Sequence, residues 1–217
     1  MRRLIKMILK YLKSAKKIQA INTVEKKTIP MENKMSHFDI GLKKVLICEG
    51  GYVFDPDDRG GETYRGVARK FHGEWKGWDE IDLIKENRPI KFNEIIKSQA
   101  LDMEIAKFYK KKFYKANWNK LQVETVATEI MEAYVNYGSF VFKLVQRALV
   151  KIGIVVGVDG KYGKQTEGAL LEMSNVQSMA FLDAFDEVRI TYIDAIIAHR
   201  PKNAKFRKGW LKRILKR

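Results

Sequence analysis

One run of turn-forming residues, EGGYVFDPDDRGGETYRGV at positions 49–67, constrains the fold more than any other part of the chain. Its paired glycines, Gly50–Gly51 and Gly60–Gly61, permit tight turns, and the spacing favours a short β-hairpin near residues 52–67. On both sides of this run, apolar residues recur at helical spacing. The sequence therefore predicts a mainly α fold with one small hairpin.

The helices are expected from periodicity and from capping residues. They cover approximately 36–48, 98–116, 124–137, a segment capped by Ser139 that ends at Gly153, 166–173 and 176–199, with a last basic turn from Pro201 to Trp210. We expect Leu101, Ile105 and Phe108 to face inward. Trp75, Trp78 and Trp118 are expected in the core, where large aromatic side chains usually lie.

Charge is concentrated at the two ends of the chain. The net charge is +16, but residues 1–34 hold ten Lys or Arg against two acids, and residues 200–217 hold nine and no acid. The body is close to neutral, so we do not expect a nucleic-acid-binding face on it. Basic ends suit any polyanion, including anionic lipid or an anionic cell wall.

The first 34 residues form a separate segment in the sequence pattern. Residues 1–21 have apolar and lysine-rich faces, which predicts a basic amphipathic helix that contacts a membrane surface. Lysines interrupt every apolar stretch, so no cleaved signal peptide is expected and the export route is not indicated. No apolar run is long enough for a membrane-spanning helix. Residues 22–35 are polar and read as a linker.

Glu49 is the strongest candidate for chemistry. It follows the apolar residues Phe38, Leu42 and Val45 by eleven, seven and four positions, which places it on the buried face at the end of the first helix. Burial disfavours the charged carboxylate and raises the pKa, as a proton donor near neutral pH requires. The alternative is a helix-terminal glutamate that points into solvent.

The loop after Glu49 supplies further acids. Asp55, Asp57 and Asp58 all lie in it, and a second carboxylate opposite the first is what glycosidic-bond cleavage requires. Metal chemistry is not expected, because the three histidines lack ligand spacing and Cys48 is the single cysteine. On an apolar helix face, Cys48 is expected to be a small buried hydrophobe. We expect no cofactor.

Several motifs, in order, resemble glycoside hydrolase family 108, a family of N-acetylmuramidases. The motifs are Glu-Gly-Gly-Tyr at 49–52, Pro-x-Asp-x-Gly-Gly-x-Thr at 56–63, Asn-x-Gly at 136–138, Gln146–Leu149 followed by Val158–Thr166, and a closing set of Arg189, Tyr192, Pro201, Phe206, Gly209, Trp210 and Arg213. The resemblance covers about residues 36–214. It implies a lysozyme-like catalytic region, here 35–122, and a helical peptidoglycan-binding region, here 123–217, after the extension 1–34.

By position, the resemblance implies that Glu49 protonates the leaving oxygen of a β-1,4 bond. Asp58 would be the base or charge stabiliser, with Asp57 as its substitute, although a turn aspartate often binds only its own backbone. The Glu-x8-Asp spacing of Glu49 and Asp58 also resembles phage-type lysozymes, in which a threonine follows the aspartate. Thr63 comes one residue earlier than the threonine of that pattern. The remaining candidates are Tyr52 and Tyr64, as sugar platforms or core residues, and Asn136, as a substrate ligand or helix cap.

The resemblance therefore implies a muramidase that acts on peptidoglycan in the cell wall or periplasm. A lytic transglycosylase, which closes a 1,6-anhydro ring instead of adding water, is the alternative enzyme. A basic nucleic-acid-binding protein is the non-enzymatic alternative, and the neutral body argues against it. In the element 158–166, Gly160 and Gly163 are expected to form a turn whose backbone Asp159 holds.

Overall fold

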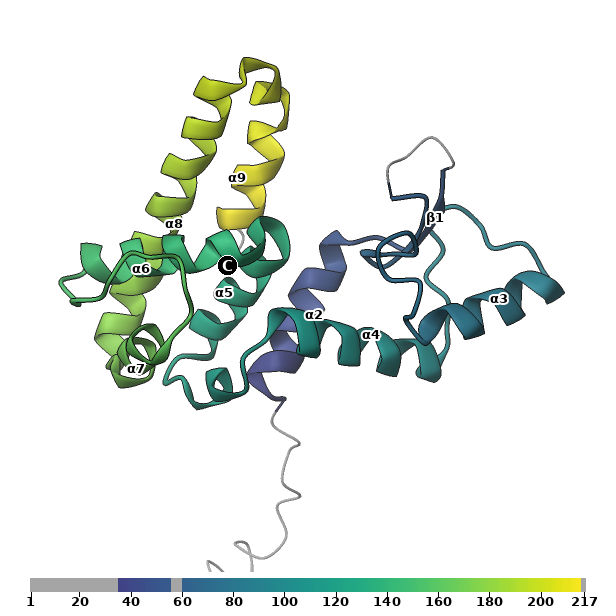
Figure 1. Ribbon diagram of the computed structural model, residues 1–217, viewed down its shortest axis with the longest axis horizontal. Helices are drawn as coiled ribbons and strands as arrows, with labels where there is room; N and C mark the ends of the chain where they lie inside the picture. Colours follow the sequence, from purple (N-terminus) through teal and green to yellow (C-terminus); the bar gives the residue numbers. More distant parts are fainter. Residues whose placement is uncertain (1–34, 56–59, 216–217) are drawn as a thin grey trace, which may run out of the picture. The chain divides into compact units, whose positions relative to one another are not determined.

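The computed structural model describes residues 35–55 and 60–215. The described residues from Ser36 onward cluster as one compact unit (Figure 1). The expected N-terminal helix and linker lie outside the described residues, as do Asp57 and Asp58. The structure places the remaining candidate site residues within the described part of the chain.

The fold is mainly α with a small antiparallel sheet, which confirms the predicted class. The helices are α2 (His37–Cys48), α3 (Gly77–Asn87), α4 (Gln99–Phe113), α5 (Glu124–Tyr137), α6 (Val141–Lys151), α7 (Lys164–Glu172), α8 (Asn175–His199) and α9 (Arg207–Leu215). Short 3-10 turns are η1 (Ala116–Lys120), η2 (Gly138–Phe140) and η3 (Pro201–Phe206). The strands are β1 (Tyr52–Phe54), β2 (Glu62–Tyr64) and β3 (Val67–Ala68).

Helix α2 begins with a capping box and packs on α5. The Ser36 side chain accepts a hydrogen bond from Asp39 N at 3.2 Å, while the Asp39 carboxylate accepts from Ser36 N at 3.2 Å. Phe38, Leu42 and Val45 are buried, as their spacing predicts. The apolar face therefore fixes the rotation of α2, and with it the direction in which Glu49 leaves the helix.

The sheet has the order β1–β2–β3, with Tyr52 opposite Tyr64 and Tyr64 opposite Val67. The β2–β3 turn consists of Arg65 and Gly66, both with positive φ (45° and 80°). Positive φ at both central residues is the pattern of a type I′ turn, whose twist matches that of paired strands. This tight turn brings the end of β2 back towards the end of α2.

Two details of the middle of the chain differ from expectation. Helix α3 was not predicted, because Trp78 and Ile81 are its only fully buried large apolar side chains and the rest of the segment is mainly polar. In α4, Leu101 and Ile105 face inward as expected, but Tyr109 is the buried third member and Phe108 is half-buried. Ser98 caps α4 by accepting from Leu101 N at 3.3 Å.

The C-terminal helices pack around α8. Helices α6, α5 and α9 all contact α8, and Figure 1 shows α9 folding back beside it. Ser139 does not cap the helix after it, since it lies in η2 and α6 begins at Val141. The expected last turn, which was to end at Trp210, instead continues as η3 and α9 to Leu215, because Trp210 and the buried Ile214 pack inward at helical spacing.

The turn at 158–163 is held by Gln146 from α6. Its amide donates to the Asp159 carboxylate at 2.8 Å and accepts from Gly160 N at 2.7 Å. Asp159 also accepts from Lys161 N at 2.9 Å, so its expected role in fixing the turn is confirmed. Gly160 needs its glycine at φ 77°, whereas Gly163 is extended at φ −116°, which any residue adopts.

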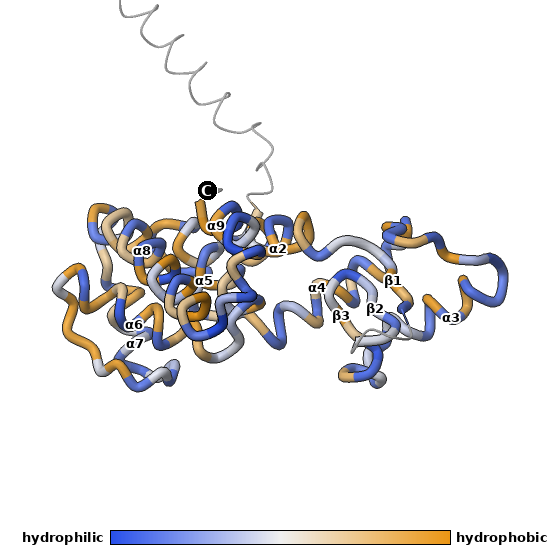
Figure 2. The backbone as a smooth tube through the Cα atoms, turned by 90° about the horizontal axis from the view of Figure 1, so that it is seen from above, coloured by the Kyte–Doolittle hydropathy of each residue, from blue (hydrophilic) through white to orange (hydrophobic). Residues whose placement is uncertain are grey.

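Figure 2 shows hydrophobic and hydrophilic stretches alternating along the helices, as amphipathic packing requires. The large aromatics Trp75, Trp78 and Trp118 are buried, as predicted. Over the part of the chain that the structure describes, no helix combines the length and apolar character needed to cross a membrane.

Candidate active site

Glu49 forms the C-terminal cap of α2 and is half-buried. A Cβ atom built on Gly66 would lie 2.7 Å from Glu49 Oε2 and nearer still to the Tyr109 hydroxyl. The glutamate carboxyl and the tyrosine hydroxyl therefore border one small space above the β2–β3 turn. Any side chain larger than that of glycine at position 66 would displace one or both of these groups.

Hydrogen bonds hold the turn beside Glu49. Arg65 N donates to Gly51 O at 3.3 Å, and the Tyr109 hydroxyl donates to Arg65 O at 3.0 Å. The first bond ties the turn to the glycine pair that follows α2, and the second ties it to α4. Three separate elements thus converge on the candidate acid.

Burial raises the pKa of Glu49, and the positive charge of Arg213 in α9 partly opposes this by favouring the carboxylate. Burial also raises the pKa of Tyr109, and the nearby Glu49 charge adds to the shift. Among the described residues, no group donates a hydrogen bond to the Glu49 carboxyl, and no cation lies within ion-pair distance of it. A half-buried carboxyl whose burial outweighs the attraction of a nearby cation keeps its proton to higher pH and can donate it to a leaving oxygen.

The two tyrosines of the sheet have structural partners. Tyr64 has 0% of its surface exposed and stacks on Trp75 at 6.4 Å between ring centroids. Tyr52 is 7% exposed and donates from its hydroxyl to Glu62 Oε1 at 2.7 Å. Neither ring has a free face for a sugar in this arrangement, so core packing accounts for both.

Thr63 lies on the other face of the sheet. It pairs with Val53 and Ala68, and it is half-buried where Tyr64 and Glu62 are buried. Of the predicted site residues on the hairpin, Thr63 is thus the one that the fold leaves partly open. The acid expected opposite Glu49, Asp58, is not among the described residues.

Asn136 is bound within the protein rather than acting as a backbone cap at the end of its helix. Its amide nitrogen donates to both the backbone oxygen and Oε1 of Glu132, each at 2.8 Å. Its amide oxygen accepts from Arg213 Nη1 at 2.8 Å. Asn136 therefore links α5 to α9, and it lines a cavity of about 300 Å³ between them.

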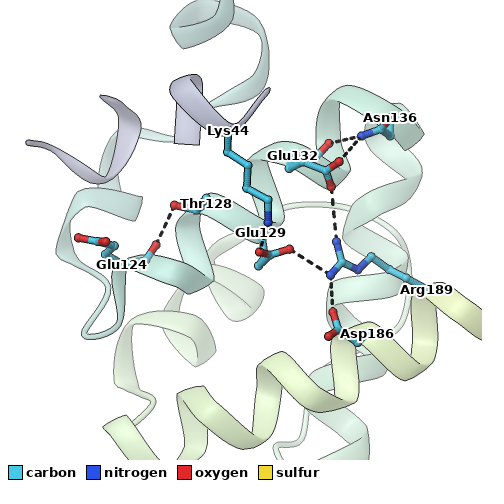
Figure 3. Close-up of polar contacts among 8 residues, drawn as sticks. All are labelled: Lys44, Glu124, Thr128, Glu129, Glu132, Asn136, Asp186 and Arg189. Carbon is cyan, nitrogen blue, oxygen red and sulfur yellow. Dashed lines mark hydrogen bonds and ion pairs between the residues drawn. The ribbon is translucent and has the colours of Figure 1, made fainter. Parts of the chain in front are cut away.

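A buried ion network lies behind Asn136 (Figure 3). Arg189 of α8 is 0% exposed and contacts Glu129 at 3.1 Å, Glu132 at 3.6 Å and Asp186. Lys44 of α2 pairs with Glu129 from the other side. Burial raises the pKa of Glu132, while the Arg189 charge opposes the shift. The network ties α2, α5 and α8 together.

Sequence reasoning missed three residues of this arrangement. Tyr109 was overlooked because Phe108, one position earlier, fits the same apolar stripe. Glu132 lies one helical turn before the Asn-x-Gly motif at 136–138, and nothing in that motif points to the glutamate. Arg213 appeared only in the family resemblance, and no sequence pattern links it to Glu49.

Cys48 differs from expectation, because it is exposed at the last turn of α2 rather than buried. It lines a second cavity, of about 500 Å³, which shares Glu132 and Arg213 with the first. Across residues 35–55 and 60–215, no three His, Cys, Asp or Glu side chains gather as a metal site would require.

Comparisons with known proteins agree with this architecture. Residues 42–138 match the family model described as Glycosyl hydrolase 108, and residues 141–215 match the model described as Predicted Peptidoglycan domain. No curated protein matches the chain.

Among solved structures, the Brucella abortus SagA structure is similar, with a TM-score of 0.50 and 21% sequence identity over 82% of this chain and 90% of that one. At that identity the likeness supports the fold alone. The two family models are adjacent, and the first begins within α2 and spans the Glu49 turn. By these two matches the chain is a glycoside hydrolase acting on peptidoglycan, with a glycoside hydrolase family 108 domain over residues 42–138 and a C-terminal peptidoglycan-binding region over residues 141–215.

Proposed function

We propose that the protein is an N-acetylmuramidase in which Glu49 is the general acid. The bond cleaved is the β-1,4 linkage between N-acetylmuramic acid and N-acetylglucosamine. The observation that carries this is the environment of Glu49: a half-buried carboxyl that lies against the Gly66 backbone, whose pKa is raised by burial more than the Arg213 charge lowers it.

In this reaction the Glu49 proton passes to the glycosidic oxygen while the bond to the muramic C1 breaks. An oxocarbenium-like centre develops at C1, and a nearby carboxylate stabilises it or activates a water. We assign that role to Asp58, with Asp57 as the substitute. The water oxygen forms the new bond to C1. The proton that the water releases replaces the one that Glu49 gave to the leaving oxygen, so the two carboxyl groups return to their starting protonation.

Substrate contacts are assigned more narrowly than the sequence suggested. Thr63 is kept as a substrate ligand, because its face of the sheet is partly open. Asn136 is assigned a supporting role, in which its hydrogen bonds hold Arg213 and Glu132 in place. Tyr52 and Tyr64 are assigned to packing. The regions 35–122 and 123–217 are proposed as the catalytic and wall-binding parts of the described unit.

The protein acts at the cell wall, since both family regions concern peptidoglycan. We further propose that residues 1–21 contact anionic membranes. Loss of binding to vesicles of anionic lipid after deletion of residues 1–21 supports that contact, and unchanged binding contradicts it.

Digestion of purified sacculi tests the assignment. Glu49→Gln keeps the shape of the side chain but removes its proton, so turnover falls by about 10²–10⁴-fold or more. Glu172→Gln, an exposed glutamate on α7, is the matched control and digests at the parent rate. Clearing by Glu49→Gln close to the parent rate contradicts the proposal.

Product analysis by mass spectrometry separates the two enzyme classes. A reducing-end muramic sugar is expected for a muramidase. A 1,6-anhydro sugar identifies the protein as a lytic transglycosylase, in which Glu49 has the same role as acid.

A further inference from the structure

The larger of the two cavities described above lies between the last turn of α2, helix α5 and the C-terminal helix α9. It has a volume of about 500 Å³ and is lined by Lys44, Ile47, Cys48, Glu132, Gly209, Lys212 and Arg213. Cys48 directly precedes Glu49, and Arg213 acts electrostatically on the Glu49 carboxyl. Helix α9 of the C-terminal region thus forms one wall of this space, and Arg213 on that wall is close enough to Glu49 to act on its charge.

The charges in this cavity are not balanced. Lys44 is paired with the buried Glu129, and Glu132 is held by Asn136 and Arg189. In contrast, no acid among the described residues lies within ion-pair distance of Lys212. Arg213 donates to the neutral amide of Asn136. Two cations from α9 therefore line the cavity without an ion pair to any carboxylate in the described part of the chain, although the Arg213 charge acts at longer range on Glu49 and Glu132.

The opposite wall is apolar. Ile47 is 76% exposed on the last turn of α2, beside the exposed Cys48. Gly209 adds no side chain, and a Cβ built on it would meet nothing within 4 Å. The cavity therefore offers room, an aliphatic surface and positive charge along one side.

We infer that this cavity binds the peptide stem carried by the muramic sugar, with Lys212 and Arg213 contacting its carboxylates. The inference rests on the proposed function, because it needs the muramic sugar to lie at Glu49. In an intact strand the carboxyl of the lactyl group on the muramic sugar forms the amide bond to the stem peptide and carries no charge. The acidic groups near the glycan therefore belong to the stem. Such a peptide alternates small aliphatic residues with acidic ones. Its aliphatic side chains would contact Ile47 on one wall, and its carboxylates would contact Lys212 and Arg213 on the other.

Paired substrates test this site: soluble glycan strands with stems, and the same strands stripped of stems by an amidase. We compare kcat/KM on the two substrates as a ratio. Lys212→Gln is expected to lower the ratio by about three- to tenfold, since a charge-assisted contact at a partly exposed position is lost. Lys212→Arg restores it. Lys208→Gln, which removes the same charge from α9 outside the cavity, leaves the ratio at the parent value.

A binding measurement separates this inference from the catalytic proposal. In the Glu49→Gln background, calorimetry with a soluble disaccharide–tetrapeptide is expected to show about three- to tenfold weaker binding when Lys212→Gln is added. Equal losses from Lys212→Gln and Lys208→Gln, or equal losses on both substrates, overturn the stem site. Failure of the catalytic proposal instead appears as full turnover by Glu49→Gln alone.

Discussion

Replacing Gly66 with alanine tests whether the space between Glu49 and Tyr109 matters for turnover. The glycine is required twice: its φ of 80° is left-handed, and its missing side chain leaves room for two oxygens. Gly153 at the end of α6 has a similar φ of 84°, and a Cβ there would meet nothing within 4 Å. Gly153→Ala therefore carries the backbone strain without the collision.

The collision can be sized from the geometry. The alanine Cβ would lie 2.7 Å from Glu49 Oε2, whereas ordinary van der Waals contact begins at 3.4 Å. The carboxyl must therefore retreat by about 0.7 Å, and the Tyr109 hydroxyl by more. Misplacing a reacting group by ~1 Å costs about 10²-fold in rate. Left-handed backbone strain adds about 1–2 kcal/mol of lost stability in both variants.

Turnover on soluble glycan strands and thermal unfolding measure the two effects separately. We expect Gly66→Ala to lose about 10²-fold in turnover and Gly153→Ala less than about threefold. Both lose about 2–8 °C in Tm, since about 1 kcal/mol corresponds to roughly 2–4 °C at this size. Equal turnover by the two alanine variants would refute the idea that the carboxyl must occupy this space.

Three further predictions follow from the same contacts. Arg213→Gln removes a charge that favours ionised Glu49, so the pKa of Glu49 rises and the alkaline limb of the pH–rate profile moves to higher pH; Arg213→Lys keeps it near the parent position. Arg189→Met removes the buried cation that Glu129, Glu132 and Asp186 share and costs about 3–5 kcal/mol, or about 6–20 °C in Tm. Burial raises the pKa of Glu132, and without the opposing Arg189 charge that pKa rises further, so the variant loses stability as pH rises; a pH-independent Tm would contradict this. Tyr52→Phe loses one hydrogen bond to Glu62, about 1 kcal/mol, and keeps its turnover; a large fall in turnover with normal Tm would return Tyr52 to the substrate site.

Local patterns in the sequence predicted the parts of the site that are fixed by residues close together along the chain. The helical spacing of Phe38, Leu42 and Val45 is enough to orient α2, and the glycine-rich run is enough to predict the hairpin. The inward face of Glu49 follows from these two facts. Burial then accounts for the raised pKa of Glu49.

Contacts between distant segments were beyond that reasoning. Phe108 and Tyr109 both fit an apolar stripe, and only packing against the Arg65–Gly66 turn selects the tyrosine. The charge of Arg213 acts on Glu49 because α9 folds back along α8, and no local sequence pattern encodes that packing. Cys48 is exposed because the last turn of α2 borders a cavity instead of the core.

The account depends on Glu49 holding its proton above the pH at which an exposed glutamate loses it. Carbon-detected NMR titration of the labelled side-chain carboxyls, with Glu49→Gln to assign the resonance, measures this directly. We predict a pKa for Glu49 above the ordinary value of 4.5, because burial outweighs the Arg213 charge. A midpoint at or below 4.5 would contradict the assignment of Glu49 as the general acid.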